Sequence, residues 1–527
     1  MPIGIWGKAS AGEIIRVTLG SPAAMATASI SVTAAADGAW QAMLPAMAAG
    51  GPFTLTVVGV KQTVTINDVM IGEVWLCAGQ SNMEFQLSRV ADATQEIADS
   101  EYPDLRLTTI STAASLSEEV TARLVPWQVS APASAPNFSA VCFLMGRTIQ
   151  KQLKVPVGLI AATWGGTTAE AWTSASALAA IEDFRDALAL VESKKPVTQT
   201  DPTLLYNGMI NPLIRFRLRG VAWYQGESNV ARGYQYGRLL PTMITDWRKR
   251  FALDLPFALV QLPNNGNAQT VPVESAPWAI LRENQAAAAD GVAPVTMVVT
   301  IDTGAINAAL PSPVDLHPVN KADVGNRLGR SVLEAFYAQP GPRSPIYDHF
   351  AIEGKTIRVF FRALAANENL MVGKKIAVDP VTADPTGVPA GFAIAGADKK
   401  WVAAGAVIDG ATIVVSAATV AAPAAVRYGW AADPPVNLYG QGGMPVTPFR
   451  TDRDYGVMIS GGSGAGISAL GEGVFNQGAK VAIKATVPVG KAFDRWVGDT
   501  TVLSNPAAAE STLSMPASYV SLRALFK

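Results

Sequence analysis

The chain has 527 residues, of which 49% are hydrophobic and 16% charged, and its formal net charge is −1. This composition excludes a disordered protein, and the near-zero charge without a basic cluster gives no electrostatic reason to bind nucleic acid or an anionic membrane. No apolar run approaches the roughly 20 residues of a membrane-spanning helix. The length exceeds what one hydrophobic core usually organises, so we expect several domains.

Residues 1–70 predict a β domain. Alternating and β-branched runs, such as Ile14–Leu19 and Phe53–Val58, are separated by Gly and Asp turns. The segment Met1–Trp6 has neither the charged region nor the apolar stretch of a signal peptide. We therefore expect either a cytoplasmic protein or a mature or trimmed form of an exported one.

Residues 71–338 predict an α/β domain, because short apolar strands alternate with helical periodicity. The expected strands are Glu73–Ala78, Leu105–Ile110, Val157–Thr163, Val221–Gln225, Phe257–Leu262 and Val295–Asp302. The expected amphipathic helices are Phe138–Leu153, Leu178–Val191, Tyr234–Phe251 and one that follows His317. This alternation predicts a parallel sheet covered by helices on both faces, with a ligand site outside the carboxyl ends of the strands.

Residues 339–454 predict a second β domain, which begins with the Pro/Gly-rich link Gln339–Pro345. Its expected strands are Thr356–Phe361, Ala411–Ser416 and Ala425–Trp430. Residues 455–527 predict a further small β unit. Two cysteines, Cys77 and Cys142, are too few for a disulfide framework or a zinc site, and both lie in apolar segments. We interpret them as two buried thiols.

The strongest chemical motif follows the first strand of the α/β region. An apolar strand runs into Gly79-Gln80-Ser81, and a helical pattern begins at once. This arrangement predicts an exposed Ser81 hydroxyl at a strand-to-helix turn, where the unpaired N–H groups of a helix N-terminus stabilise a developing oxyanion. The alternative is that Ser81 only caps the helix.

A serine nucleophile generally needs a base, and the chain has only 2 histidines. His317 follows the last predicted strand and precedes a helix, which places it at the same sheet edge as Ser81, whereas His349 lies in the β region beyond. We predict His317 as the general base; the alternative is a helix-leading residue without a role. Asp315 would accept the Nδ1–H of His317, with Asp302 as second candidate, unless Asp315 is only a solvated loop carboxylate.

Two further polar turns follow strands at this edge. In the first, Gln225 offers a side-chain amide to an oxyanion, whereas Glu227 is acceptor-only when ionised and orients its neighbours. In the second, Gly165 and Gly166 let backbone N–H groups approach a ligand closely. Each turn alone is an ordinary strand end, but their succession favours a functional site.

These blocks resemble, in order, those of bacterial sialate O-acetylesterases of the SGNH-hydrolase superfamily, which are related to carbohydrate acetyl and acetylxylan esterases. The blocks are Gly79–Met83, Trp164–Thr167, Trp223–Asn229 and Asp315–Pro318. The resemblance covers roughly residues 1–452 and implies a flavodoxin-like three-layer α/β catalytic domain flanked by β-sandwich segments. One departure concerns Asp315, since many superfamily members carry the aspartate at the position of Val314. Another is that Gln225-Gly226-Glu227 replaces the asparagine of the third block.

Matching positions imply a role for each site residue. Ser81 would be the nucleophile, and His317 and Asp315 would complete the triad. The oxyanion donors would be the Ser81 N–H, a backbone N–H of Gly165 or Gly166, and the Gln225 side chain. Asn82, Glu227 and Trp164 belong to the same blocks and are assigned to the oxyanion and substrate-binding region.

The tail from about residue 455 resembles a bacterial surface-repeat module of the internalin B-repeat type, through Lys491–Asp499 and Met515–Ala517. Such modules are usually extracellular. We therefore expect a secreted or periplasmic protein, with a cytoplasmic location as the alternative.

The predicted function is a serine esterase that removes O-acetyl groups from carbohydrates through an acyl-enzyme, with no metal or cofactor. Two alternatives remain open: a deacetylase of xylan or another plant polysaccharide, and an inactive carbohydrate-binding surface protein. A sialate carboxylate would require an arginine, for which Arg282 and Arg232 are candidates. Aromatic residues near the site would either stack on a sugar or fill the core: Trp164, Trp172, Trp223 and Tyr224.

Overall fold

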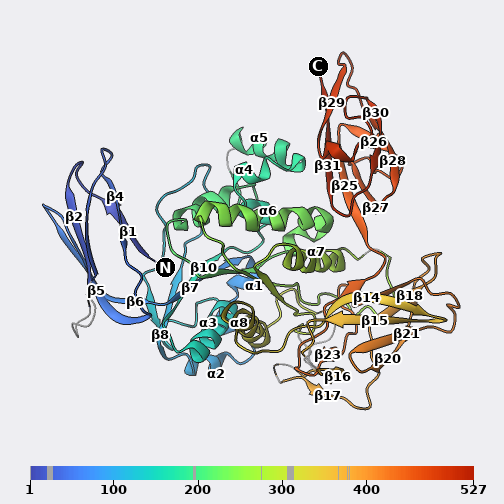
Figure 1. Ribbon diagram of the computed structural model, residues 1–527, viewed down its shortest axis with the longest axis horizontal. Helices are drawn as coiled ribbons and strands as arrows, with labels where there is room; N and C mark the ends of the chain where they lie inside the picture. The colour runs from blue at the N-terminus through green and yellow to red at the C-terminus, as the bar shows by residue number, and fades with distance from the viewer. Residues whose placement is uncertain are drawn as a thin grey trace.

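The computed structural model describes residues 2–20, 28–193, 197–274, 276–304, 314–365, 367–376, 378 and 380–527. At its centre is a 7-stranded sheet with the order β13-β12-β11-β7-β10-β8-β9 (Figure 1). Its strands pair in parallel except β9, which is antiparallel to β8. They are β7 Glu73–Gly79, β8 Tyr102–Thr109, β9 Gln128–Ser130, β10 Val157–Thr163, β11 Gly220–Tyr224, β12 Phe257–Val260 and β13 Val295–Val298.

Helices cover both faces of this sheet, which confirms the predicted mixed α/β architecture with a mostly parallel sheet. Helices α3 (Ala140–Leu153) and α8 (Lys321–Tyr337) pack against each other on one face, and α6 (Gly233–Phe251) and α7 (Pro277–Gly291) lie on the other (Figure 1). Shorter helical elements lie in the connections: α1 Ser81–Glu84, η1 Leu87–Arg89, α2 Ala93–Ala98, η2 Ala169–Trp172, α4 Ala175–Leu178, η3 Glu182–Phe184, α5 Arg185–Ser193, η4 Tyr206–Ile210, η5 Asn211–Leu213 and η6 Glu227–Arg232.

Two expectations for this region were wrong in detail, and one helix was missed. The segment predicted as one helix over 178–191 is broken into α4, η3 and α5. The last strand ends at Val298 instead of Asp302, because residues 300–303 turn back with the N–H of Thr303 donating to the carbonyl of Thr300. Helix α7 was not predicted, since its alanine-rich sequence carries only a weak apolar stripe.

The strand register explains how distant turns meet. Gly79, the last residue of β7, lies opposite Thr163 at the end of β10 and opposite Tyr224 at the end of β11. The N–H of Trp164 donates to the carbonyl of Gly79, and the N–H of Gln80 donates to the carbonyl of Tyr224, each at 3.1 Å. Gly79 has φ +142°, and a Cβ there would lie 2.1 Å from the Tyr224 carbonyl oxygen, so only glycine fits.

The N-terminal residues form β strands, as predicted. They build one sheet of β1 and β4 and a second with the order β3-β2-β5-β6. The strands are β1 Ile3–Lys8, β2 Ile14–Gly20, β3 Ala28–Thr33, β4 Ala39–Leu44, β5 Gly50–Val58 and β6 Thr63–Ile71. Their buried side chains, which include Val17, Trp40 and Leu55, form a hydrophobic cluster separate from that of the central sheet.

The residues that follow α8 are again β, in two further units with separate hydrophobic clusters. The first contains β14 Ile346–Glu353, β15 Thr356–Arg362, β16 Leu370–Lys374, β17 Thr382–Ala383, β18 Phe392–Ala395, β19 Val402–Ala403, β20 Gly405–Asp409, β21 Thr412–Ser416, β22 Ala425–Tyr428, β23 Leu438–Gly440 and β24 Phe449–Arg450. The second contains β25 Asp454–Ser460, β26 Gly462–Gly464, β27 Glu472–Asn476, β28 Lys480–Ala485, β29 Phe493–Gly498, η7 Thr500–Val502, β30 Glu510–Ser514 and β31 Val520–Phe526.

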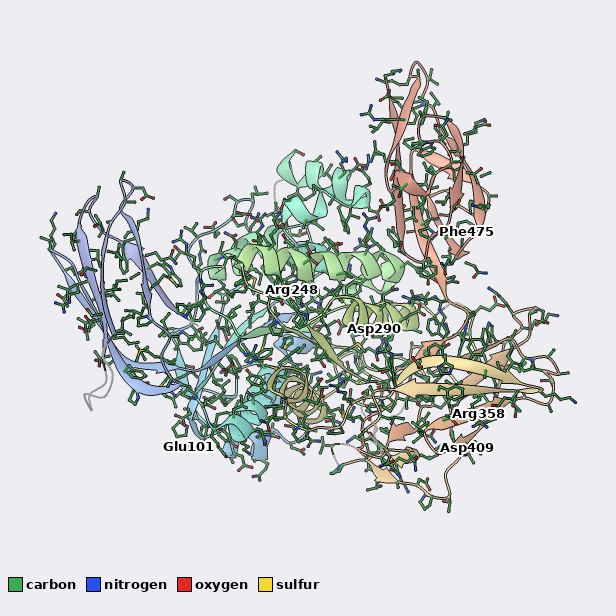
Figure 2. The ribbon with its side chains drawn as sticks, in the orientation of Figure 1. Glu101, Arg248, Asp290, Arg358, Asp409 and Phe475 are labelled. Carbon is green, nitrogen blue, oxygen red and sulfur yellow. A yellow bond between two sulfur atoms is a disulfide. The ribbon has the colours of Figure 1, made fainter. Side chains whose placement is uncertain are left out.

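Ion pairs join these β units to the central domain. Asp290, near the end of α7, pairs with Arg362 of β15 at 2.8 Å (Asp290 is labelled in Figure 2). In the terminal unit, Arg523 pairs with Asp186 of α5 at 2.8 Å. Within the part of the chain that the structure describes, no helix is both long and apolar enough to cross a bilayer.

Candidate active site

The structure brings Ser81 and His317 into direct contact. Ser81 is the first residue of α1, directly after the turn at the end of β7, and its Oγ lies 2.8 Å from Nε2 of His317. The residue at the helix cap is Gln80, so Ser81 does not cap the helix. An alcohol that shares a hydrogen bond with an imidazole is the arrangement of an activated serine nucleophile.

Burial holds the pKa of His317 below its ordinary value. Desolvation is the main cause, and the positive charges of Lys321 and then Arg89 act in the same direction, while Asp315 opposes them. The imidazole is therefore neutral at neutral pH, which is the form that accepts a proton from the serine.

The expected hydrogen bond between His317 and Asp315 is not formed. The Oδ1 atom of Asp315 accepts the backbone N–H of His317 at 2.8 Å, which leaves it 3.7 Å from Nδ1 of the ring. The Asp315 side chain is 72% exposed. It acts on the imidazole as a nearby negative charge, without bonding to the ring.

Asp302 does not replace Asp315 as the orienting residue. Its buried carboxylate accepts two hydrogen bonds from Arg327, at 2.6 and 2.8 Å, and a third from the hydroxyl of Tyr439 at 3.1 Å. The arginine holds the pKa of Asp302 below its usual range against the effect of burial. This carboxylate anchors α8 and β23 to the end of the sheet.

Backbone N–H groups beside Ser81 form a candidate oxyanion site. As the first residue of a helix, Ser81 has no intrahelical acceptor for its N–H. Gly165 lies next to it, since a Cβ at Gly165 would be only 3.4 Å from the Cβ of Ser81. The Gly165 N–H, however, donates to the carboxylate of Glu84 at 2.7 Å, and Gly166 next to it is exposed with φ +72°. Sequence reasoning missed Glu84.

Gln225 does not lie free as an oxyanion donor. Its side chain is buried, and its amide nitrogen donates to the carbonyl of Thr167 at 3.1 Å and to Oδ1 of Asn229 at 2.7 Å. Both N–H bonds are thus used to join the turns after β10 and β11. In the structure Gln225 thus belongs to the scaffold of the site, and its role as an oxyanion donor stays a prediction.

Asn82 connects the nucleophile turn to the histidine loop. Its buried amide nitrogen donates to Oε1 of Glu227 at 2.5 Å and to the carbonyl of Leu316 at 3.0 Å, and its Oδ1 accepts from Nζ of Lys321 at 2.5 Å. Burial raises the pKa of Glu227 and lowers the pKa of Lys321 to about 7. Lys321 was not singled out in the sequence; a lysine at the start of a helix, where the dipole disfavours it, is the signal that points to it.

Most of the aromatic residues near the site are core residues. Trp172, Trp223 and Tyr224 are almost fully buried, and the ring of Trp223 packs edge-on against that of Trp172 at 6.1 Å. Trp164 is half-buried and packs against the same core. Of the four, only Trp164 retains surface with which to contact a substrate.

The two arginines that were candidates for binding a substrate carboxylate are bonded to other groups of the protein. Arg282 is buried and donates to backbone carbonyls, including those of Leu262 and Ala431, which fixes α7 to the following β unit. Arg232 pairs with Glu170 at 2.5 Å. Arg89, which was not predicted, is exposed and stacks on Phe85, with 4.8 Å between its Cζ and the ring centroid. No carboxylate pairs with Arg89 in the described part of the chain.

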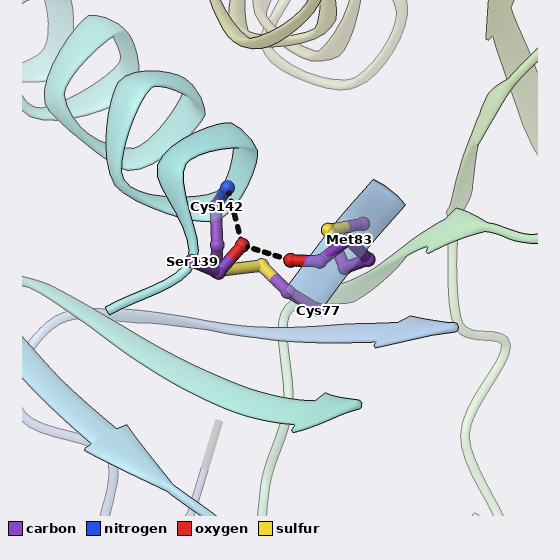
Figure 3. Close-up of a disulfide and its surroundings, with 4 residues drawn as sticks. All are labelled: Cys77, Met83, Ser139 and Cys142. Carbon is purple, nitrogen blue, oxygen red and sulfur yellow. Dashed lines mark hydrogen bonds between the residues drawn. A yellow bond between two sulfur atoms is a disulfide. The ribbon is translucent and has the colours of Figure 1, made fainter. Parts of the chain in front are cut away.

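Cys77 and Cys142 form a disulfide, so the interpretation as two buried thiols was wrong. Cys77 in β7 precedes Ser81, and Cys142 lies in the first turn of α3 (Figure 3). Next to the bridge, the Ser139 hydroxyl donates to the carbonyl of Met83 at 2.6 Å and accepts the N–H of Cys142 at 3.2 Å. The nucleophile turn is therefore attached to α3 on both of its sides.

The other histidine takes no part in this site. His349 lies in β14, exposed, where its ring stacks on Phe360 at 4.3 Å and its Nδ1 bonds to Asp348 at 2.8 Å. Among the described residues, no three His, Cys, Asp or Glu side chains are grouped so as to hold a metal ion.

Comparisons with known proteins relate the chain to carbohydrate esterases. Residues 71–334 match the family described as carbohydrate esterase, sialic acid-specific acetylesterase, and residues 455–527 match the divergent InlB B-repeat domain. A carbohydrate acetylesterase from Xanthomonas citri is 33% identical; the match covers 86% of this chain and 96% of that one, with a TM-score of 0.74.

Mammalian proteins match over a shorter span. The sialate O-acetylesterase of Homo sapiens is 33% identical over 282 residues, which are 50% of this chain and 54% of the human protein. That of Mus musculus is 33% identical over 303 residues, with 49% and 56% covered. The chain thus spans about half the length of these relatives. On the family match and the Xanthomonas structure together, the chain belongs to the sialic acid-specific acetylesterase family of carbohydrate esterases.

Proposed function

We propose that this protein is a serine esterase that removes O-acetyl groups from carbohydrates, with Ser81 as nucleophile and His317 as general base. The observation that carries the proposal is the 2.8 Å contact between the Ser81 Oγ and the His317 Nε2, at the carboxyl edge of the sheet, in a member of a carbohydrate esterase family. His317 remains 36% exposed, so an acetyl group on a sugar reaches the pair without opening a buried cavity.

The reaction would proceed in two steps. Nε2 of His317 removes the Ser81 proton while Oγ attacks the acetyl carbonyl carbon, and the resulting imidazolium protonates the sugar oxygen as the ester bond breaks. Water then attacks the acetyl-enzyme with His317 again as base, which releases acetate and frees Ser81. The N–H groups of Ser81 and Gly165 would bind the oxyanion in both steps, once the Glu84 carboxylate has left the Gly165 N–H.

Within this activity, we favour an acetylated sugar that carries a carboxylate, as sialic acid does. The support is Arg89, an exposed guanidinium in a segment attached to the histidine loop, because the N–H of Ala91 donates to the carbonyl of Val319 at 3.0 Å. The positive charge of Arg89 lowers the pKa of His317, which is consistent with a position of Arg89 beside the reacting ester. A neutral acetylated polysaccharide such as xylan is the alternative that the experiment below distinguishes.

The domain division and the location also belong to the proposal. The domains would be residues 1–70, 71–338, 339–454 and 455–527, and the second would be a flavodoxin-like three-layer unit, in line with the separate hydrophobic clusters and the helices on both sheet faces. Secretion or export to the periplasm is supported by the Cys77–Cys142 bridge, since disulfides persist in oxidising compartments.

Measurements of ester hydrolysis test both the esterase activity and the choice of sugar. Wild-type protein should hydrolyse para-nitrophenyl acetate, and Ser81→Ala and His317→Gln should each lose nearly all of that activity while keeping their circular dichroism spectrum. An inert wild type would instead favour a binding protein. A panel of O-acetylated sialic acid, acetylated xylan and acetylated glucose then identifies the sugar: a preference of about tenfold in kcat/KM, roughly 1.4 kcal/mol in the transition state, is sufficient.

A further inference from the structure

One side chain beside the reacting pair links the nucleophile turn to the histidine loop. Asn82 follows the nucleophile and touches the histidine loop at two points. Its amide nitrogen bonds to the carbonyl of Leu316, directly before His317, and its Oδ1 bonds to Nζ of Lys321, directly after the loop. The loop is thus held at both ends by one side chain that moves with the nucleophile.

An amide side chain has two orientations, and its neighbours select one. With Oδ1 toward an ammonium donor and the nitrogen toward the acceptors Leu316 and Glu227, every contact of Asn82 pairs a donor with an acceptor. Lys321 supplies the only one of these groups that cannot accept a hydrogen bond when protonated. Without it, Oδ1 of Asn82 would lose its donor, and the start of α8 would lose its direct bond to the residue that follows the nucleophile.

The surroundings of Lys321 are unfavourable for a cation that has only a structural role. The side chain is 0% exposed, and it lies in the first turn of α8, where the helix dipole opposes a positive charge. Against these costs, the faces of the Phe85 and Tyr224 rings attract the ammonium, with Nζ at 4.8 and 5.7 Å from their centroids. An apolar side chain of the same length would fill this space at lower cost.

We propose that Lys321 is a positioning residue for the esterase reaction: its buried ammonium fixes the Asn82 amide so that the His317 loop is held against Ser81. The proposal rests on the proposed function, because it assumes that the Ser81–His317 pair performs the chemistry. Lys321 touches neither substrate nor the reacting atoms, so it acts through Asn82 and through its charge.

The charge of Lys321 adds an effect that can be measured separately. The charged groups that act on His317 are Lys321 from α8, Arg89 from η1 and Asp315 from its own loop. Those that act on Lys321 are Glu227 from η6 and Asp315. Because the pKa of Lys321 is about 7, the ammonium is protonated over the acidic range in which His317 titrates, and there it helps to keep the imidazole neutral.

The test is the variant Lys321→Met, which keeps the length of the side chain and removes the ammonium. We expect kcat for para-nitrophenyl acetate to fall roughly 10- to 100-fold with little change in KM, as for a small misplacement of reacting groups. The acidic limb of the pH profile should move to higher pH by about half a unit or more, since a like charge next to His317 is gone. A merely structural role predicts no such shift.

Two controls make the outcome decisive. Arg330→Met removes a positive charge from the exposed face of the same helix and should leave kcat and the pH profile unchanged, because solvent screens that charge. In an Asn82→Ala background, Lys321→Met should lower kcat only a little further, because the Asn82 side chain through which Lys321 acts on the histidine loop is already absent.

A folded Lys321→Met variant with wild-type kcat and pH profile would overturn the inference, as would full additivity with Asn82→Ala. These results are distinguishable from a failure of the proposed function, which fails if Ser81→Ala or His317→Gln retains activity or if the wild type has none.

Discussion

Nε2 of His317 lies 2.8 Å from Oγ of Ser81, although 236 positions separate the two residues in the chain. Two anchors maintain this contact. On the serine side, the Cys77–Cys142 disulfide and Ser139 attach the nucleophile turn to α3. On the histidine side, the Asn82 amide donates a hydrogen bond to the carbonyl of Leu316, and α8, which follows the loop, packs on α3. The reacting pair is therefore placed by two helices that share an interface.

The first prediction concerns pH. Burial and the charges of Lys321 and Arg89 lower the pKa of His317 from its ordinary value of 6.5, and Asp315 only partly opposes them. A base must be neutral to act, so kcat/KM should rise with pH through a midpoint below 6.5. The measurement is the pH dependence of para-nitrophenyl acetate hydrolysis, corrected for the uncatalysed rate. A midpoint above 7 would contradict the electrostatics described.

The second prediction concerns Asp315. Because its carboxylate is exposed and 3.7 Å from Nδ1, Asp315→Asn should lower kcat by only about tenfold, compared with roughly 10⁴-fold where a buried carboxylate bonds the imidazole. Steady-state kinetics with para-nitrophenyl acetate measures this loss, and Asp290→Asn, at a remote ion pair, is the matched control. A loss beyond about 1000-fold would mean that the carboxylate closes onto the ring in the working enzyme.

The third prediction concerns Glu84, whose carboxylate occupies the N–H of Gly165 beside Ser81. A negative charge there competes with the developing oxyanion for the same donor. Glu84→Ala should therefore raise kcat/KM for neutral acetyl esters severalfold, and Glu84→Gln should do so less, since its side-chain oxygen still accepts the N–H. A fall in activity for both variants would show that Glu84 helps to bind the ester.

Much of the fold could be predicted from the sequence because the central strands are short apolar runs and three of the covering helices carry regular apolar stripes. Helix α7 escaped prediction because its alanine-rich sequence gives hardly any periodicity. The break between α4 and α5 coincides with tertiary contacts: Asp183 of η3 accepts hydrogen bonds from Ser521 of the last strand and from Tyr519, which directly precedes that strand. A local pattern contains no information on such a distant partner.

Site residues of a rare type could be predicted from the sequence, whereas site residues of common types could not. With only 2 histidines in the chain, the base for Ser81 could be selected by position alone. Lys321, Glu84 and Arg89 are charged residues in helices, where solvated side chains are the ordinary case. Gln225 was assigned to the oxyanion because its turn lies at the right edge, but a sequence does not show that Thr167 and Asn229 already use its N–H groups.

The fourth prediction concerns substrate charge. If Arg89 binds a carboxylate of the sugar, Arg89→Gln should lower kcat/KM for O-acetylated sialic acid roughly 10- to 100-fold, the loss expected for a charge-assisted hydrogen bond. Hydrolysis of para-nitrophenyl acetate and acetylated xylan should change little, and Arg89→Lys should recover part of the activity. Equal losses on charged and neutral esters would remove the argument for an anionic sugar.

The fifth prediction concerns the disulfide, which closes a loop of 65 residues between β7 and α3. A cross-link over such a loop restricts the unfolded chain, with a contribution of about 4 kcal/mol in the chain-entropy estimate. The double variant Cys77→Ala/Cys142→Ala should therefore have a clearly lower melting temperature than wild type. Near 25 °C its kcat should stay close to the wild-type value, because Ser139 still holds the carbonyl of Met83.

Reductant supplies the matched control for this variant. Both cysteines are 0% exposed, so a mild thiol should leave the melting temperature of the native protein unchanged, whereas reduction after unfolding should lower it to that of the double variant. Replacing Ser139 by Ala in the double variant removes the second attachment of the turn to α3, and kcat should then fall even well below the melting temperature. An unchanged kcat in that triple variant would mean that Asn82 and the sheet register alone hold Ser81 against His317.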